Sequence, residues 1–254
     1  MIDAHCHLYS DKYHHDLHKV VQRAQAKLQA VIISAVDLES LQKSLAIRRQ
    51  YPDFIKVTAG IHPRHGARLK KEELSEIWRA IKSVQEEIVA LGEVGPDFYH
   101  IKDRRLRQRQ LSVLEDAMAQ AEAMGLPLVI HARQAEKAAL EVVARCKTPV
   151  LFHCFAGTRE MAREITAHGF YLSLSAILLF SSELQRAITE VPLELILTET
   201  DSPALSPKPT QQRNEPAFLE TIVSRLADLF DLPVDRVGSI TAVNAGRFYR
   251  LADL

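Results

Sequence analysis

The chain has 254 residues, of which 47% are hydrophobic and 25% charged, an ordinary composition for one large globular domain. Its 32 Lys and Arg residues balance its 32 Asp and Glu residues. This excludes a basic field over the whole molecule, so a nucleic-acid substrate would need local phosphate contacts. Three scattered cysteines exclude a disulfide framework and favour a reducing compartment, the cytoplasm. We expect no signal peptide and no membrane-spanning segment.

Short apolar runs rich in Val, Ile, Leu or Phe alternate with longer segments of helical period. The predicted strands are Ile2–His7, Ala30–Ala35, Ile55–Ala59, Ile88–Leu91, Leu128–His131, Val150–His153, Phe170–Leu174 and Leu193–Thr198. Among the segments between them, the predicted helices are Leu17–Leu28, Leu38–Arg49 and Arg105–Met124, the last ending at a Gly125 C-cap. Two further helices, Ala217–Phe230 and Val234–Phe248, follow with no strand between them.

Eight β units separated by helices predict an α/β fold, a single-domain (β/α)8 TIM barrel over residues 1–254 with extra C-terminal helices. The alternative is a doubly wound open sheet, but no glycine-rich phosphate loop follows the first strand. Pro203, Pro207 and Pro209 indicate a loop after the eighth strand and not a domain boundary.

Candidate metal ligands stand at the ends of five predicted strands, on the barrel face that carries active sites. They are His5 and His7 in the first strand, Glu93 after the fourth, His131 and His153 at the ends of the fifth and sixth, and Asp201 after the eighth. Residues at i and i+2 of a strand point to the same face, so the first two imidazoles can reach one metal. A single such residue would prove little, but six at one face predict a metal site.

Two metal ions about 3.5–4 Å apart need a bridging anionic ligand and can share one water. We expect Glu93 to bridge them, the histidines of the first strand to hold one ion, and His131 with His153 to hold the other. Asp201 would ligate a metal and accept a proton from the shared water, so Glu93 and Asp201 are the predicted catalytic residues. Metal binding lowers the pKa of water towards neutrality, which predicts hydrolysis at phosphorus or at a carbonyl carbon. Zn, Mg, Mn, Ni and Fe all stay possible, and the histidines favour transition metals.

Seven short motifs occur in order along the chain. They are Asp3-Ala4-His5-Cys6-His7, Gly60-Ile61-His62-Pro63, Gly92-Glu93-Val94-Gly95-Pro96-Asp97, His131-Ala132-Arg133-Gln134-Ala135, His153-Cys154-Phe155-Ala156-Gly157, Glu199-Thr200-Asp201-Ser202-Pro203 and Arg213-Asn214-Glu215-Pro216. Together they resemble the TatD family of metal-dependent hydrolases, within the amidohydrolase-like barrels. The resemblance implies a TIM barrel, two divalent metals and hydrolysis. The activity often named for this family is deoxyribonuclease, typically an Mg-dependent exonuclease that proceeds from 3′ to 5′. The resemblance therefore also implies this activity.

Three positions depart from the family pattern. Arg64 follows Pro63 where the family usually has histidine, and His65 comes one place later. Pro96 replaces the usual leucine and stiffens its loop, and Ala156 replaces the common serine. None of these is a proposed metal ligand, so the departures bear on substrate choice more than on hydrolysis.

Four residues are candidates for substrate contact, namely His62, Arg64, Arg133 and Arg213. For His62 we expect contact with substrate and not metal ligation. The guanidinium groups of Arg133 and Arg213 suit bidentate phosphate binding, and an ion pair with a loop carboxylate is the alternative for each. The few aromatic residues form no stripe, so no stacking platform for single strands is expected.

Two acidic residues stand two positions before a proposed ligand, so that their side chains share its face of the strand. Asp3 precedes His5 in this way, and Glu199 precedes Asp201. We expect Glu199 to stand behind a ligand or to position substrate. For Asp3, a hydrogen bond that orients a ligand and a buried structural hydrogen bond are equal alternatives.

Three functions remain for this chain. The first is a phosphodiesterase acting on DNA or a small phosphoester, and the second is a hydrolase of a small amide, lactone or ester. The third, a binding or scaffold protein with a vestigial site, fits poorly with a complete ligand set. We expect a monomer or weak homo-oligomer that has no membrane partner.

Overall fold

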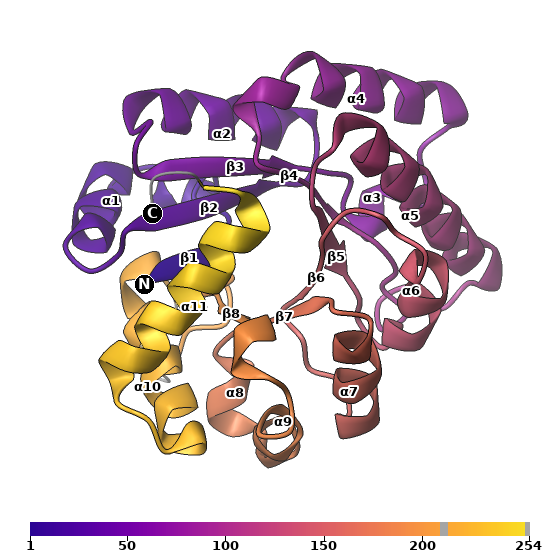
Figure 1. Ribbon diagram of the computed structural model, residues 1–254. Coiled ribbons are helices and arrows are strands. Elements are labelled where there is room, and N and C mark those ends of the chain that lie inside the picture. Colours follow the sequence, from indigo (N-terminus) through magenta and orange to yellow (C-terminus); the bar gives the residue numbers. More distant parts are fainter. Residues whose placement is uncertain (209–212, 252–254) are drawn as a thin grey trace.

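A computed structural model describes residues 1–208 and 213–251, so Pro209 lies outside the described residues. Eight parallel strands pair in chain order. They are β1 (Ile2–Cys6), β2 (Ala30–Ala35), β3 (Ile55–Ala59), β4 (Ala90–Val94), β5 (Leu128–His131), β6 (Val150–His153), β7 (Tyr171–Leu174) and β8 (Ile196–Thr198). Helices surround this barrel (Figure 1), which confirms the predicted (β/α)8 architecture and excludes the open sheet.

The helices lie outside the strands, except for the last one. Their bounds are α1 (Leu17–Gln25), α2 (Leu38–Gln50), α3 (Pro63–Gly66), α4 (Lys71–Ser83), α5 (Arg104–Met124), α6 (Glu136–Val143), α7 (Arg159–Ala167), α8 (Ile177–Phe180), α9 (Ser182–Ile188), α10 (Leu219–Phe230) and α11 (Val234–Tyr249). Single 3-10 turns occur at Asp11–Tyr13, Gln85–Glu87, Leu193–Leu195 and Pro216–Phe218. No helix among the described residues is both long enough and apolar enough to cross a membrane.

Four predicted strands have different bounds in the structure. Two differ by one residue, because β1 ends at Cys6 and not at His7, and β7 begins at Tyr171 and not at Phe170. The fourth was expected at Ile88–Leu91 but runs from Ala90 to Val94, so that Glu93 lies inside β4. The eighth was expected from Leu193, but Leu193–Leu195 is a 3-10 turn. The Asn244 side-chain amide in α11 donates to the carbonyls of Leu193 and Ile196 at 2.8 Å and so anchors this turn.

Hydrogen bonds between β1 and the segment after β8 bring the two ends of the sheet together. The Asp201 N–H donates to the His5 carbonyl at 3.0 Å, and the His7 N–H donates to the Ser202 carbonyl at 2.7 Å. Asp201 therefore sits beside the two histidines of the first strand, although almost two hundred residues separate them along the chain.

The barrel has two hydrophobic cores. The larger lies between the outer faces of the strands and the surrounding helices. The smaller fills the barrel near the strand N-termini, where Ala4, Ile32 and Val129 meet Phe248 and Tyr249 of α11. The Tyr249 hydroxyl donates to the Ala4 carbonyl at 2.8 Å. Helix α11 thus lies across one end of the barrel (Figure 1), and only the opposite end is left for chemistry.

Asp3 joins β1 to the segment after β8 from inside the protein. The Thr200 N–H donates to Asp3 Oδ1 at 2.8 Å, and the Thr200 hydroxyl donates to Oδ2 at 2.6 Å. Of the two alternatives for Asp3, the buried structural hydrogen bond is the one observed. Burial raises the pKa of Asp3 from its ordinary value of 3.8 to about 8.

This pKa predicts a pH dependence of stability. Between about pH 4 and pH 8 the folded protein keeps a proton on Asp3 that the unfolded chain releases, so this group's contribution to the unfolding free energy falls as pH rises. Asp3→Asn should remove that contribution, and urea unfolding at pH 5 and pH 8 would measure it. Asp116→Asn, at an exposed helix position, is the control. An unchanged pH dependence in Asp3→Asn would contradict the prediction.

Candidate metal centre

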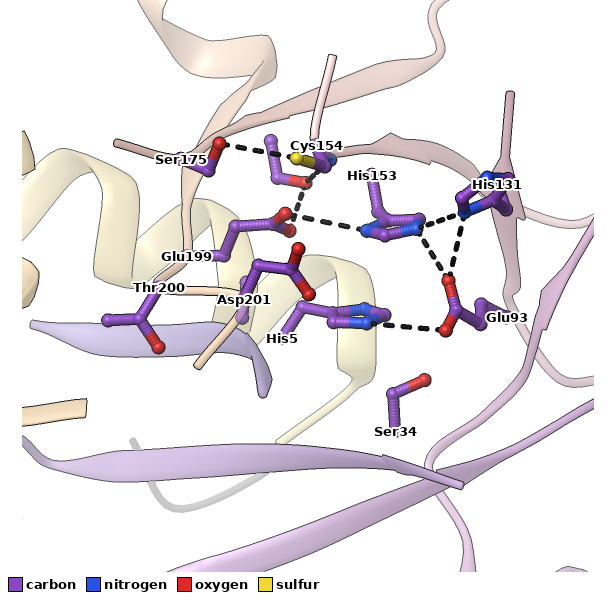
Figure 2. Close-up of polar contacts among 12 residues, drawn as sticks. His5, Ser34, Glu93, His131, His153, Cys154, Ser175, Glu199, Thr200 and Asp201 are labelled. Atoms are coloured by element: carbon purple, nitrogen blue, oxygen red, sulfur yellow. Dashed lines mark hydrogen bonds and ion pairs between the residues drawn. The ribbon is translucent and has the colours of Figure 1, made fainter. Parts of the chain in front are cut away.

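Glu93 stands at the centre of a histidine cluster at the open end of the barrel, as Figure 2 shows. Its Oε2 lies 2.7 Å from His153 Nε2 and 3.2 Å from His131 Nδ1. Its Oε1 faces the first strand, 4.0 Å from His5 Nε2 and 3.8 Å from His7 Nε2. Each oxygen of this carboxylate is nearest to one pair of histidines, and the His5 and His153 rings of the two pairs stack with their centroids 4.0 Å apart. The bridging role of Glu93 stays a prediction.

Asp201 completes the set on the first-strand side. Its Oδ1 lies 3.3 Å from His7 Nε2. Three groups of side chains have possible ligand atoms within 4.8 Å of one another: His5 with Glu93 and His153, His5 with His7 and Asp201, and His62 with Glu93 and His131. All six predicted ligands are therefore brought together, and His62, expected to touch only substrate, also lies within ligand distance.

Glycines let the backbones approach closely enough to form this cluster. A Cβ on Gly95, whose φ is +148°, would lie 2.1 Å from the His131 carbonyl oxygen. A Cβ on Gly60 would lie 2.5 Å from the Glu93 carbonyl oxygen. The pairing of β4 with β5 also shifts register between Leu91 and Val94, an irregularity that changes the direction of the intervening side chains.

The chemistry of His5 fits a metal ion. Both of its ring nitrogens are buried and have no hydrogen-bond partner among the described residues. Burial, with repulsion from His153, lowers the pKa of His5 well below its usual value, which keeps the ring neutral. A neutral imidazole with an unsatisfied buried nitrogen is suited to bind a metal, because leaving such an atom unpaired costs free energy.

Glu93 supplies the negative charge. Burial opposes its ionisation, but attraction to His153 and hydrogen bonds from His131 and His153 outweigh burial and lower the pKa of Glu93 well below its usual range. The buried carboxylate is therefore an anion at neutral pH, as a ligand shared by two cations must be.

Hydrogen bonds behind the ligands fix their ring orientation. Glu199 Oε1 lies 3.4 Å from His153 Nδ1, and the Ser173 hydroxyl donates to Glu199 Oε2 at 2.5 Å. His7 Nδ1 lies 3.0 Å from the Ser34 carbonyl oxygen, so it donates there and leaves Nε2 for a metal. Glu199 thus lies behind a ligand, as expected.

Asp97 was not singled out from the sequence. Its Oδ2 lies 3.7 Å from His131 Nε2 and 2.6 Å from His100 Nδ1. The carboxylate thus faces the Nε2 side of His131, while Nδ1 of the same ring faces Glu93. The available signal was its place four residues after Glu93 in the third of the seven motifs.

A first cavity, called here the Tyr99 cavity, opens on one side of the cluster with a volume of about 410 Å³. Tyr99, His131, Arg133, His153 and Asp201 line it, together with apolar residues that include Ala156. The Arg133 guanidinium lies 4.2 Å from the centroid of the Tyr99 ring, and Tyr99 is 46% exposed. One exposed aromatic ring therefore borders this cavity, with a guanidinium over its face, although no stacking platform for single strands was expected from the sequence.

A second cavity, called here the α3 cavity, has a volume of about 560 Å³ and is lined in part by Glu93. Its wall includes His7, His62, Arg64 and Arg68. The two departures from the family pattern at Arg64 and Ala156 thus lie in different cavities, each bordering the metal ligands.

Arg213 is not brought to the centre. Its two terminal nitrogens each lie 2.7 Å from an Asp16 carboxylate oxygen, and one also donates to the Lys12 carbonyl at 2.8 Å. It lines neither of the two cavities. Of the two alternatives for Arg213, the ion pair with a loop carboxylate is the one observed.

Comparison with known proteins decides the family. The model of the protein family described as "TatD related DNase" matches residues 2–250 of this chain. The chain belongs to the TatD family. Its TatD relatives include the metal-dependent hydrolase YabD of Bacillus subtilis, which is 30% identical over 258 residues that cover 99% of both proteins. The 3′-5′ ssDNA/RNA exonuclease TatD of Erwinia tasmaniensis is 30% identical over 264 residues, covering 99% of this chain and 100% of that protein.

A solved TatD structure has the same fold. The TatD homologue YJJV of Escherichia coli matches with a TM-score of 0.90 and 23% identity, covering 98% of each chain. Membership of the TatD family makes this protein a metal-dependent hydrolase, so the scaffold alternative is set aside. The number and identity of its metal ions, the roles of single residues and the cytoplasmic location stay predictions.

Proposed function

We propose that this TatD protein is a two-metal phosphodiesterase that removes nucleotides from the 3′ end of single-stranded DNA. The observation that carries the proposal is the Tyr99 cavity, which places an exposed aromatic ring and a guanidinium beside His131, His153 and Asp201. A ring of this kind can stack on any base, and a guanidinium suits a phosphate. The relative from Erwinia tasmaniensis is named a 3′-5′ ssDNA/RNA exonuclease.

The metal ions would be held in two groups that share Glu93. His5 and His7 lie nearest to Oε1, with Asp201 beside His7, and His131 and His153 lie nearest to Oε2. Divalent ions at such a centre supply Lewis-acid activation of water and neutralise the charge of a phosphoryl group.

Other side chains supply the remaining steps. Asp201 borders both the ligand cluster and the Tyr99 cavity, where its carboxylate can accept the proton of the attacking water. Arg133 would hold a phosphate oxygen of the terminal nucleotide, and Tyr99 would stack on its base.

His62 is placed to donate a hydrogen bond to substrate. Its Nδ1 accepts the Arg64 N–H at 3.2 Å, so a neutral ring carries its proton on Nε2. Burial lowers the pKa of His62 to about 4, which keeps the ring neutral at physiological pH.

The test is a metal-dependent exonuclease assay on a 5′-labelled single-stranded oligonucleotide. Protein stripped with chelator and restored with Mg, Mn or Zn should shorten the strand stepwise, and a phosphorothioate at the last linkage should delay the first cut. Glu93→Ala and Asp201→Ala exclude a contaminating nuclease.

Substitutions in the Tyr99 cavity then test its part in binding. Arg133→Gln should raise KM about tenfold, because it removes one charge-assisted hydrogen bond to phosphate, while Arg145→Gln, at an exposed position outside both cavities, should not. If the restored protein binds metal and leaves DNA intact, but hydrolyses a small ester, lactone or amide, the nuclease proposal is wrong and the carbonyl alternative replaces it.

A further inference from the structure

The α3 cavity carries positive charge that the metal centre does not use. Arg64 and Arg68 both line it and are exposed. Among residues 1–208 and 213–251, neither guanidinium forms an ion pair with a carboxylate. The ion pairs at this wall involve histidines, His7 with Glu93 and His65 with Asp37, each at 3.8 Å. Two arginines without an acidic partner at the mouth of one cavity form a site for an anion.

The two arginines lie on one face of a fixed turn. The Arg68 guanidinium donates to the Arg64 carbonyl at 3.0 Å, as residues one helical turn apart can. Behind the turn, the Gln110 amide donates to the Pro63 carbonyl at 3.1 Å, and the His62 N–H donates to the Val36 carbonyl at 3.1 Å. The backbone that carries the arginines is thus anchored to α5 and to the end of β2.

The two cavities differ in a way that suits the two sides of a cleaved strand. The Tyr99 cavity offers an aromatic ring and apolar side chains, which suit a nucleoside. The α3 cavity offers guanidinium and imidazole groups, which suit phosphates. Both border the ligand cluster, one at His131 and Asp201 and the other at His7 and Glu93. A phosphate held at the cluster would therefore lie next to both cavities.

Resting on the phosphodiesterase function above, we propose that Arg64 and Arg68 bind a backbone phosphate of the retained strand, on the 5′ side of the bond that is cut. The site makes the enzyme sensitive to charge beyond the scissile linkage. Substrates with a phosphate at that place gain binding energy that a nucleotide diester without it cannot gain.

The first experiment compares two substrates in the metal-loaded protein. One is a single-stranded oligothymidylate, and the other is thymidine 5′-(p-nitrophenyl phosphate), which has a scissile diester but no further phosphate. Arg64→Gln and Arg68→Gln should each lower kcat/KM for the oligothymidylate about tenfold and leave the chromogenic diester unchanged. Arg64→Lys should retain more activity than Arg64→Gln. Arg79→Gln is the matched control, because Arg79 is exposed and also donates to a backbone carbonyl four residues earlier, at 3.4 Å.

The second readout is binding without turnover. The affinity for a phosphorothioate oligothymidylate, measured by fluorescence anisotropy across salt concentrations, should depend less on salt in each variant, with a slope smaller by about 0.7 for each phosphate that the variant no longer binds. Equal decreases on both substrates, or an unchanged salt slope, would overturn the subsite and leave the phosphodiesterase intact. Hydrolysis of neither substrate by the wild-type protein would instead overturn the phosphodiesterase itself.

Discussion

Replacing Glu93 with glutamine should remove metal binding and hydrolysis together. The glutamine side chain has nearly the same size, but it offers no negative charge between the two histidine pairs that Oε1 and Oε2 now separate. We expect kcat to fall by about 10³-fold or more, because the negative charge that would hold both ions in the proposed centre is removed. Assay of the purified variant, with metal content measured by plasma mass spectrometry, checks both parts.

The control for this change is Glu141→Gln, an exposed glutamate on α6 that should behave as wild type. Circular dichroism of both variants establishes that the barrel is folded. A Glu93→Gln protein that retains its full metal content and wild-type activity would show that Glu93 is not a shared ligand.

Restoring metal to the chelator-treated protein should raise its melting temperature by about 10 °C. At a metal concentration of about a thousand times Kd, binding to the folded state alone adds about 4 kcal/mol of stability, and a chain of this size gains a few degrees for each kcal/mol. The physical source lies in the buried nitrogens of His5 and the buried charge of Glu93, which metal ions would satisfy. Differential scanning calorimetry with and without metal measures the shift.

The Glu93→Gln variant should lose most of this shift, which separates binding at the centre from nonspecific stabilisation by the salt. Equal melting temperatures for chelated and restored protein would mean that the cluster holds no ion tightly, and both the ligand set and the two-metal proposal would need revision.

The barrel was predictable because its strands carry a strong local signal. Runs such as Ala30–Ala35 and Leu128–His131 are mostly apolar, with Ser34 and His131 as their polar residues, and both are strands with the predicted bounds. The fourth strand was placed too early, since Gly92 and Glu93 interrupt the apolar pattern. A charged residue inside a buried strand can be predicted only when its partners are known. The partners of Glu93 come from strands that are distant in the sequence.

The candidate ligands were predictable for a related reason. Parallel strands of a barrel end at one face, so polar residues at strand ends meet there without any knowledge of loops. Side chains in the loops were harder. The pairing of Arg213 with Asp16 joins residues far apart in the chain, and the approach of Tyr99 to Arg133 depends on a loop that pairs with the end of β5.

Helix α11 also limits how a polynucleotide can move. Phe248 and Tyr249 fill the barrel at the strand N-termini, so the described residues leave no channel along the barrel axis. Under the proposed nuclease activity, a DNA strand could not thread through the protein as it is shortened. The released nucleotide and the retained strand would both leave by the open end of the barrel, where the two cavities lie. We therefore expect the free nucleotide to inhibit competitively and the enzyme to dissociate often from its strand.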